Sequence, residues 1–227
     1  MDSDGAVYGF FAAPFRLQTY KNLLYLGIAF PLGLVYFVGF TVGASLGVGL
    51  SITIVGVPIL VATVAATTVA AGLEAHITSY LTGVEASVPS FLDEFDAREE
   101  VSLPGNGFFD SVKRLFTSRS TWASVVLVLS KFCFGAVSFV ALTVAAAFSS
   151  AMLAAPFVYD HPRTGVNLAF GEDAIGSYGF GPWTVDAVPE AIAVAVGGAV
   201  FVLISLNVLN ALARVQARYT VGLLGSD

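Results

Sequence analysis

The sequence predicts an all-α integral membrane protein with four transmembrane helices, arranged as two tandem hairpins. Of its 227 residues, 56% are hydrophobic and only 11% are charged, and the mean hydropathy of +0.83 lies far above that of a soluble domain. Its uncharged stretches are long enough to cross a bilayer as helices, and they form an internal repeat. A transmembrane barrel is excluded, because these stretches lack the alternation of apolar and polar positions that barrel strands show.

Residues 1–21 are predicted to lie at the cytoplasmic membrane surface. The stretch begins with acidic residues and lacks a secretory cleavage pattern, so we expect it to stay in the mature chain. Its segment "GFFAAPFRLQTYK" and the later segment "GFFDSVKRLFTSR" mix aromatic with basic residues, as do helices that lie in the headgroup layer. Plain anchoring of the neighbouring spans explains the same composition, and we favour it.

Four spans follow from the lengths of the uncharged stretches. Residues 22–73 must cross twice, because about 20 apolar residues suffice for one helix, and Gly56 and Pro58 mark the turn region at the outer surface. The remaining segments are a cytoplasmic loop at 74–121, a third span at 122–156, an external loop at 157–187, a fourth span at 188–213 and a cytoplasmic tail at 214–227.

The basic residues predict the orientation of these spans. Only Arg163 falls on the outer side and only Lys131 falls within a span. The other eight fall on one side: Arg16, Lys21, Arg98, Lys113, Arg114, Arg119, Arg214 and Arg218. By the positive-inside rule, both termini are cytoplasmic in the cell membrane.

The internal repeat relates the first span to the third at an offset of 102 residues. Thr19 then matches Thr121, and Gly33 matches Gly135. Because both copies start on the cytoplasmic side, the repeat is parallel, with its axis along the membrane normal.

Small residues predict how the first and third spans pack. Spacing by four places Gly39, Gly43 and Gly47 on one face of the first span, and small residues at this spacing let helix backbones approach closely. The repeat places a matching small face, made of Ala141, Ala145 and Ser149, on the third span. We therefore expect these two faces to pack together, an interpretation that we favour over a ligand groove.

Lys131 is the one charged residue within a predicted span, and its repeat counterpart is Ala29. A lysine stem can carry its ammonium group toward the inner headgroups, and we favour this snorkelling interpretation. The alternative is that Lys131 faces the bundle interior, where it meets a polar or anionic partner.

The external loop is the candidate surface for receiving a signal, because a loop of this length in a compact protein is more often functional than idle. Its candidate binding residues are Asp160, His161, Trp183, Asp186 and Glu190. Asp160, His161, Glu172 and Asp173 carry side chains that can bind a metal, but their spacing matches no ligand pattern. We expect no metal and no cofactor.

Motifs for catalysis and for nucleic-acid binding are missing from the sequence. It has no phosphate-binding glycine loop, no HExxH, no CxxC and no GxSxG. Cys133 is the single cysteine, so no disulfide forms within the chain. No basic domain for nucleic acid is present. We therefore expect a protein that is not an enzyme.

Several segments resemble the putative sensor domain of bacterial two-component histidine kinases, which also occurs as stand-alone membrane proteins in haloarchaea. They include "PLGLVYF" at 31–37, "GVP" at 56–58, "TW" at 121–122, "AAPFVY" at 154–159 and "VDAVPEA" at 185–191. In the third span Cys133-Phe134-Gly135 replaces the proline-leucine-glycine pattern. The resemblance implies a sensing role without a kinase output of its own, since the sequence has no phospho-acceptor histidine region.

The leading functional hypothesis is a non-enzymatic sensory or accessory module that signals through a cytoplasmic partner or a second copy of itself. Its expected docking element is the tail, where Arg214 and Arg218 accompany apolar residues at helical spacing, namely Val215, Tyr219 and Leu223. The alternative without a docking role is an amphipathic tail that rests on the lipid bilayer. A small transporter or channel subunit is the second hypothesis, and a membrane-embedded enzyme is the third.

Overall fold

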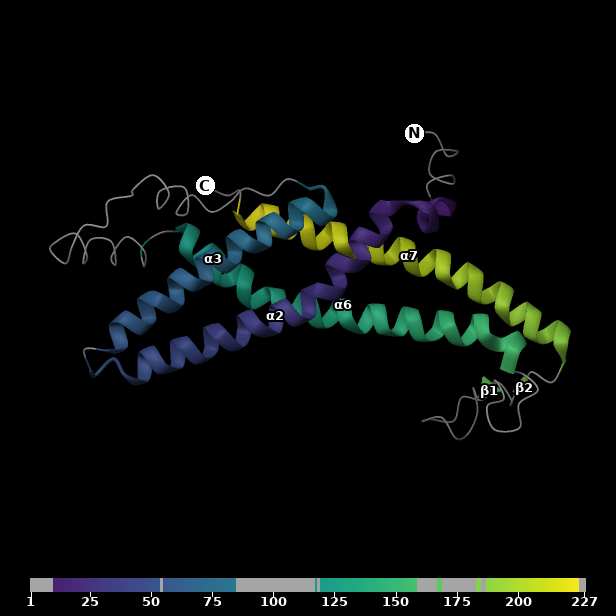
Figure 1. The fold of residues 1–227 in the computed structure, drawn as a ribbon, viewed down its shortest axis with the longest axis horizontal. Helices are drawn as coiled ribbons and strands as arrows, with labels where there is room; N and C mark the ends of the chain where they lie inside the picture. Colours follow the sequence, from purple (N-terminus) through teal and green to yellow (C-terminus); the bar gives the residue numbers. More distant parts are fainter. Residues whose placement is uncertain are drawn as a thin grey trace. The chain divides into compact units, whose positions relative to one another are not determined.

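In the computed structural model, the described residues lie almost entirely in long helices (Figure 1). The structure describes residues 10–53, 55–84, 117, 119–158, 167–168, 183–184 and 187–224. The main helices are α2 (Leu17–Gly49), α3 (Gly56–Thr82), α6 (Arg119–Val158) and α7 (Val188–Leu224). A short 3-10 helix, η1 (Ala13–Phe15), precedes α2. Two short strands, β1 (Asn167–Leu168) and β2 (Trp183–Thr184), lie between α6 and α7 in the chain.

Each of the four main helices is long and apolar enough to cross a membrane, as the sequence predicts. The protein is therefore a multi-pass membrane protein. With 33, 27, 40 and 37 residues, the helices exceed the roughly 20 residues that one crossing needs. Such helices tilt in the bilayer or continue past it.

The helices extend beyond several predicted boundaries. Helix α2 begins at Leu17 instead of residue 22, and α3 continues to Thr82 instead of ending at 73. Helix α7 continues through the predicted tail to Leu224. The predicted bounds are those of membrane spans, two of which were set at Glu74 and Arg214, and a helix can continue past the bilayer. Inside the predicted external loop, Asn167 pairs with Thr184 and Leu168 with Trp183 in an antiparallel register.

The chain divides into two compact units, with the divisions inside α6 and α7 and ahead of α2. The bundle unit comprises Arg16–Leu142 and Leu209–Asp227, and the hairpin unit comprises Met1–Phe15 and Thr143–Val208. Every buried polar side chain in the described part of the chain belongs to the bundle unit. The candidate functional site lies in this unit.

In the bundle unit, α2 and α6 approach each other at two glycines. A Cβ atom on Gly33 would lie 2.7 Å from the carbonyl oxygen of Lys131, and one on Gly135 would lie 2.5 Å from that of Ala29. The contacts are reciprocal, because Gly33 and Gly135, like Ala29 and Lys131, differ by the repeat offset of 102. Only a residue without a side chain allows this backbone contact.

Aromatic rings flank the glycine crossing with the same reciprocity. Phe30 stacks on Phe139 at 5.0 Å between ring centroids, and Phe37 stacks on Phe132 at 4.9 Å. The repeat offset converts the first pair into the second. We infer a local two-fold relation between α2 and α6 at this crossing.

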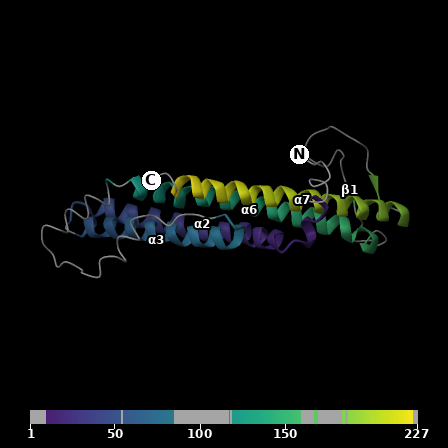
Figure 2. The ribbon, with the colours of Figure 1, turned by 90° about the horizontal axis from the view of Figure 1, so that it is seen from above.

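Helices α2 and α3 lie side by side (Figures 1 and 2). A Cβ atom on Gly43 would clash with the side chain of Thr63, and one on Gly47 would lie 2.5 Å from the side chain of Leu60, both on α3. Gly39 has nothing within 4 Å of its Cβ position. The small-residue face of α2 thus packs on α3 at Gly43 and Gly47, whereas the sequence analysis expected it to pack on the third span.

The small-residue face that the sequence predicts on α6 is divided between the two units. Ala141 is half-buried in the bundle unit, while Ala145 and Ser149 belong to the hairpin unit. The glycines that bring α2 and α6 together are Gly33 and Gly135. Spacing by four identified a close-packed face correctly at two positions but could not show which helix covers it.

A second internal correspondence links α3 with α7 at an offset of 142. Ala71 and Ala75 on α3 match Ala213 and Ala217 on α7, and all four side chains are fully buried. The buried Thr78 matches the buried Thr220 in the same way. Helix α2 therefore corresponds to α6, and α3 corresponds to α7, so the α2–α3 hairpin and the α6–α7 hairpin are two copies of one repeat.

In the hairpin unit, the outer parts of α6 and α7 pack on each other through small residues. Ala155, Ala191 and Val194 form a buried cluster, and Met152 packs against it. A Cβ atom on Gly198 would lie 2.8 Å from the Cβ of Met152, so the glycine permits the close contact.

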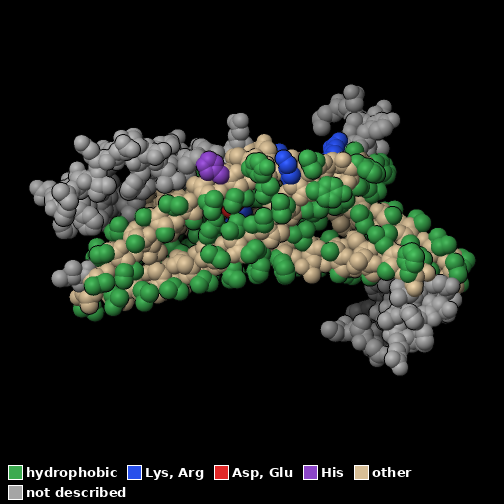
Figure 3. Space-filling view, in the orientation of Figure 1, with side chains coloured by type: hydrophobic (Ala, Val, Ile, Leu, Met, Phe, Trp, Pro, Cys, Tyr) green, Lys and Arg blue, Asp and Glu red, His purple; other side chains and the backbone are tan. Residues whose placement is uncertain are grey.

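Hydrophobic side chains dominate the face of the helices seen in Figure 3. Many of them are large and exposed, such as Val35, Val69, Val140 and Val200. Apolar residues on the outside of the helices are what a lipid environment requires.

Candidate functional site: a buried ion pair in the bundle unit

Lys131 on α6 forms a buried ion pair with Glu74 on α3. Its Nζ donates a hydrogen bond to Oε1 of Glu74, and the two side chains are only 4% and 1% exposed. They are the only charged side chains that are buried in the described part of the chain. The snorkelling interpretation of Lys131 is therefore wrong, and the alternative of an anionic partner is the one that the geometry supports.

Tyr25 on α2 connects a third helix to the pair. Its hydroxyl accepts a hydrogen bond from Lys131 Nζ at 3.0 Å and donates one to Glu74 Oε1 at 3.4 Å. The Lys131 ammonium also lies 4.3 Å from the centre of the Tyr25 ring, where the negative ring face attracts a cation. The hydroxyl of Thr78 lies 3.4 Å from both Tyr25 Oη and Glu74 Oε1.

These contacts explain how two charges can lie inside an apolar bundle. A single charge within a transmembrane segment is costly, and such residues are usually found paired or facing a polar interior. Here the ammonium is neutralised by one carboxylate, and additional hydrogen bonds come from Tyr25 and Thr78. Breaking such a pair leaves an uncompensated charge, so each partner depends on the other.

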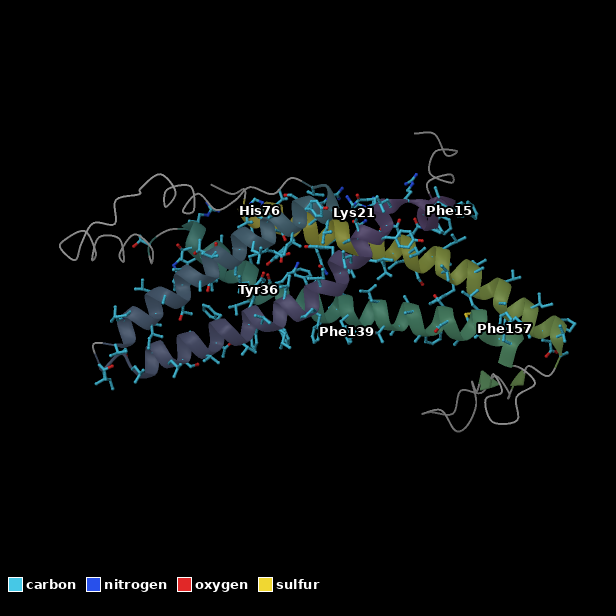
Figure 4. The ribbon with its side chains drawn as sticks, viewed as in Figure 1. Phe15, Lys21, Tyr36, His76, Phe139 and Phe157 are labelled. Atoms are coloured by element: carbon cyan, nitrogen blue, oxygen red, sulfur yellow. The ribbon has the colours of Figure 1, made fainter. Side chains whose placement is uncertain are left out.

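Two oxygen atoms at the site have no hydrogen-bond partner. They are Oε2 of Glu74 and the hydroxyl of Tyr36 on α2, and both are buried. Tyr36 lies on α2 in Figure 4. The site therefore retains hydrogen-bonding capacity that its own side chains leave unused.

A small cavity adjoins the ion pair. It has a volume of about 10 Å³ and is lined by Lys131, Ser130, Gln216 and Thr220, among others. Oε1 of Gln216 is buried and lacks a partner. A space of this size with several polar groups can hold one water molecule.

Hydrogen bonds between side chains link the remaining helices of the bundle unit. Asn22 on α2 donates to Asn210 on α7 at 2.8 Å, and Asn210 donates to Thr19 on α2 at 3.0 Å. Gln216 on α7 donates to Ser138 on α6. All four helices of the unit are therefore joined through buried polar groups.

The two internal correspondences show that the ion pair occupies one of two equivalent positions. Glu74 corresponds to Gln216, and Lys131 corresponds to Ala29. Where one half of the bundle holds a carboxylate and an ammonium, the other half holds a neutral amide that binds a serine. The shared scaffold therefore does not require the charges.

The other candidate site residues divide into three groups. Asp160, His161 and Asp186 lie outside the described residues, and so do Glu172 and Asp173. Trp183 lies in β2, and Glu190 lies in the first turn of α7.

Arg214 and Arg218 are exposed on α7, and Nε of Arg214 donates to the Asn210 carbonyl at 3.3 Å. The predicted apolar docking face of the tail is only partly exposed. Val215 is 55% exposed, but Tyr219 and Leu223 pack against a buried cluster that includes Ala71, Leu127 and Leu224. Tyr219 and Leu223, which the sequence analysis expected to be exposed, are instead partly buried against residues of α3 and α6.

The family described as "Putative sensor" matches residues 25–224, which is most of the chain. The chain belongs to this family. The match includes Tyr25, Glu74 and Lys131, so the ion-pair site lies within the sensor region. Neither the curated proteins nor the solved structures contained a match. The family name indicates a sensory role for this multi-pass membrane protein.

Sequence reasoning found Lys131 but missed its partner. The sequence predicts Glu74 as the first residue of a cytoplasmic loop, because it ends the long uncharged stretch. The signal that could have found it is the offset of 142, which matches "LEAHITSYL" at 73–81 with "VQARYTVGL" at 215–223. Since the second segment continues a helix, the first would be expected to do so as well.

Proposed function

We propose that the protein is a non-enzymatic sensory module of the cell membrane that passes its signal to a partner protein. One observation supports this proposal most directly. The Lys131–Glu74 pair joins the α2–α3 hairpin to the α6–α7 hairpin, at one of two equivalent positions. A charge pair that the scaffold does not need is a feature expected of a functional element. Membership in the sensor family supports the same role.

The ion pair supports a mechanism in which α6 moves relative to α3. Separating the two charges in an apolar environment is costly, so the bundle keeps one arrangement until a stimulus offsets that cost. The end of α7 packs on both helices through Leu224, Tyr219 and Leu223. A movement of α6 against α3 would therefore also change the position of the α7 end.

The proposed output surface is the exposed side of the α7 end, formed by Arg214, Val215 and Arg218. It lies on the side that the basic residues assign to the cytoplasm. A basic surface with one apolar residue suits an acidic partner protein near the membrane. Tyr219 and Leu223 are not part of this surface, because they pack against the buried cluster that includes Ala71 and Leu127.

A charge reversal at the output surface tests the proposal. The variant Arg214→Glu/Arg218→Glu is compared with the wild type and with Arg119→Glu, which changes an exposed arginine at the start of α6. Proteins are purified from native membranes, and the co-purifying proteins and the oligomer size are compared. We expect one associated protein to be lost with the double variant and retained with Arg119→Glu. Identical recovery from all three chains would contradict signalling through this surface.

The second candidate, a small transporter or channel subunit, would use Lys131 and Glu74 as a relay in a polar path. The cavity beside the pair has about 10 Å³, which is room for one water molecule. This small volume supports the sensory function over transport.

A further inference from the structure

The Glu74 carboxylate uses only one of its two oxygen atoms in the observed arrangement. Oε1 accepts the hydrogen bonds of Lys131 and Tyr25, while Oε2 is buried and has no partner. The hydroxyl of Tyr36, on α2, is also buried without a partner (Figure 4). Buried polar groups are almost always hydrogen-bonded, so an acceptor and a donor that both lack a partner in one bundle call for an explanation.

The other half of the bundle contains the equivalent pair of positions, and there the hydrogen bond is formed. The offset of 142 relates Glu74 to Gln216. The offset of 102 relates Tyr36 to Ser138. Gln216 Nε2 donates to the Ser138 hydroxyl and, at 3.2 Å, to the Phe134 carbonyl. By this equivalence, the side chain at position 74, which has the same length as that of Gln216, can turn toward position 36.

The residues around Oε1 explain why Glu74 turns the other way. Lys131, which forms the ion pair, corresponds to Ala29. Tyr25, the other partner of Oε1, corresponds to Leu127. Both polar partners of Glu74 are therefore replaced by apolar residues in the other half. The ammonium on α6 holds the carboxylate away from the Tyr36 hydroxyl.

We propose that the site has a second arrangement, in which the Glu74 carboxylate leaves Lys131 and accepts a hydrogen bond from the Tyr36 hydroxyl. In this arrangement α3 is bonded to α2, within its own hairpin, and is released from α6. Lys131 keeps the Tyr25 hydroxyl at 3.0 Å and the face of the Tyr25 ring, so each charge retains a polar contact. The exchange rests on the proposed function, because it names the bond that forms when α6 moves relative to α3.

The neutral half of the bundle can be reproduced at the ion-pair site. The variant Glu74→Gln/Lys131→Ala places an amide at position 74 and removes the ammonium, as in the other half. It strands no buried charge, so it gives a folded background even where Lys131→Ala alone does not. Lys131→Ala is the second background, because it retains the native carboxylate. Tyr36→Phe is introduced into the wild type and both backgrounds, and the midpoint of thermal unfolding of the full chain is measured in detergent.

Tyr36→Phe should not lower the midpoint of the wild type, because the lost hydroxyl has no partner. In Glu74→Gln/Lys131→Ala it should lower the midpoint by about 2–4 °C, the effect of one hydrogen bond in a chain of this size. The loss in Lys131→Ala should be larger, because the hydroxyl then bonds a charged group. Ser138→Ala is the matched control and should lower the midpoint in every background, since Gln216 already bonds Ser138.

Two results would overturn the exchange. An equal loss from Tyr36→Phe in the wild type and in Glu74→Gln/Lys131→Ala would mean that Tyr36 is already bonded in the observed arrangement, directly or through water. No loss in Glu74→Gln/Lys131→Ala would mean that position 74 does not reach Tyr36. Neither result involves Arg214 or Arg218, so the purification experiment tests the output surface separately.

Discussion

Lys131 and Glu74 show how a charged residue can be accommodated within a membrane helix. Each side chain is buried, and each is compensated by the other and by hydrogen bonds with Tyr25. Tyr25, on a third helix, is 1% exposed, and its hydroxyl contacts both charged groups. The energetic contribution of its hydroxyl can be measured without removing the ring.

The change Tyr25→Phe should lower the free energy of unfolding by about 1.5–3 kcal/mol, because the lost hydrogen bonds involve charged groups. Chemical denaturation in detergent measures this difference. Tyr80→Phe is the control, since Tyr80 is 76% exposed and its hydroxyl is not part of the site. An equal effect of the two changes would mean that Tyr25 contributes only its ring.

Two equivalent threonines should respond in opposite directions to removal of the hydroxyl. Thr121→Val should raise the free energy of unfolding by about 1 kcal/mol, because a buried unpaired hydroxyl is lost. Thr19→Val should lower it by about the same amount, because Asn210 loses an acceptor. Changes of the same sign for both would contradict the assignment of Thr121 as unpaired.

The residue-level prediction from sequence was half complete. Lys131 stands out because no other charge lies near it in the chain, but Glu74 stands beside polar residues and is easily taken as part of a loop. A pairing over 57 residues is a property of the folded helices and leaves no local pattern. Composition therefore identified the unusual residue, whereas only the structure identified its partner.

At the scale of elements, the glycines of α2 have different roles. Gly33 lies against the backbone of α6, whereas Gly39 has open space at its Cβ position. The four spans themselves were predicted from hydropathy alone, because length and apolar composition determine them locally. The partner of each helix face depends on the tertiary arrangement, which is why the predicted packing of Gly43 and Gly47 on the third span differs from the structure.

Alanine substitutions distinguish these two glycines. Gly33→Ala should destabilise the protein by about 1–3 kcal/mol, because the added methyl group meets the Lys131 carbonyl at 2.7 Å. Gly39→Ala should instead stabilise it by about 0.5–1 kcal/mol through its higher helix propensity. Thermal unfolding in detergent gives both values. Greater harm from Gly39→Ala would restore the packing face that the sequence analysis predicted.

At the scale of the whole molecule, four membrane helices and membership in the sensor family define the protein's class. The orientation in the membrane remains a prediction from the basic residues. It assigns the start of α6 to the cytoplasm and the connection between α2 and α3 to the outside. The proposed output surface requires this orientation.

Single cysteines test the orientation in intact cells. In a Cys133→Ser background, Ser51→Cys lies in the exposed connection between α2 and α3, and Arg119→Cys is exposed at the start of α6. A membrane-impermeant thiol reagent should label position 51 and leave position 119 unlabelled until the cells are opened. Labelling of 119 alone would invert the topology and place the output surface outside.

We infer that the buried pair of Lys131 and Glu74 holds the α2–α3 hairpin and the α6–α7 hairpin together. A double-mutant cycle with Lys131→Met, Glu74→Gln and the combined variant tests it by chemical denaturation in detergent. Each single change should cost about 3–5 kcal/mol, because it strands a buried partner. The combined variant should cost less than the sum by about 1–3 kcal/mol. Additive effects, or a Lys131→Met variant as stable as the wild type, would contradict the pair.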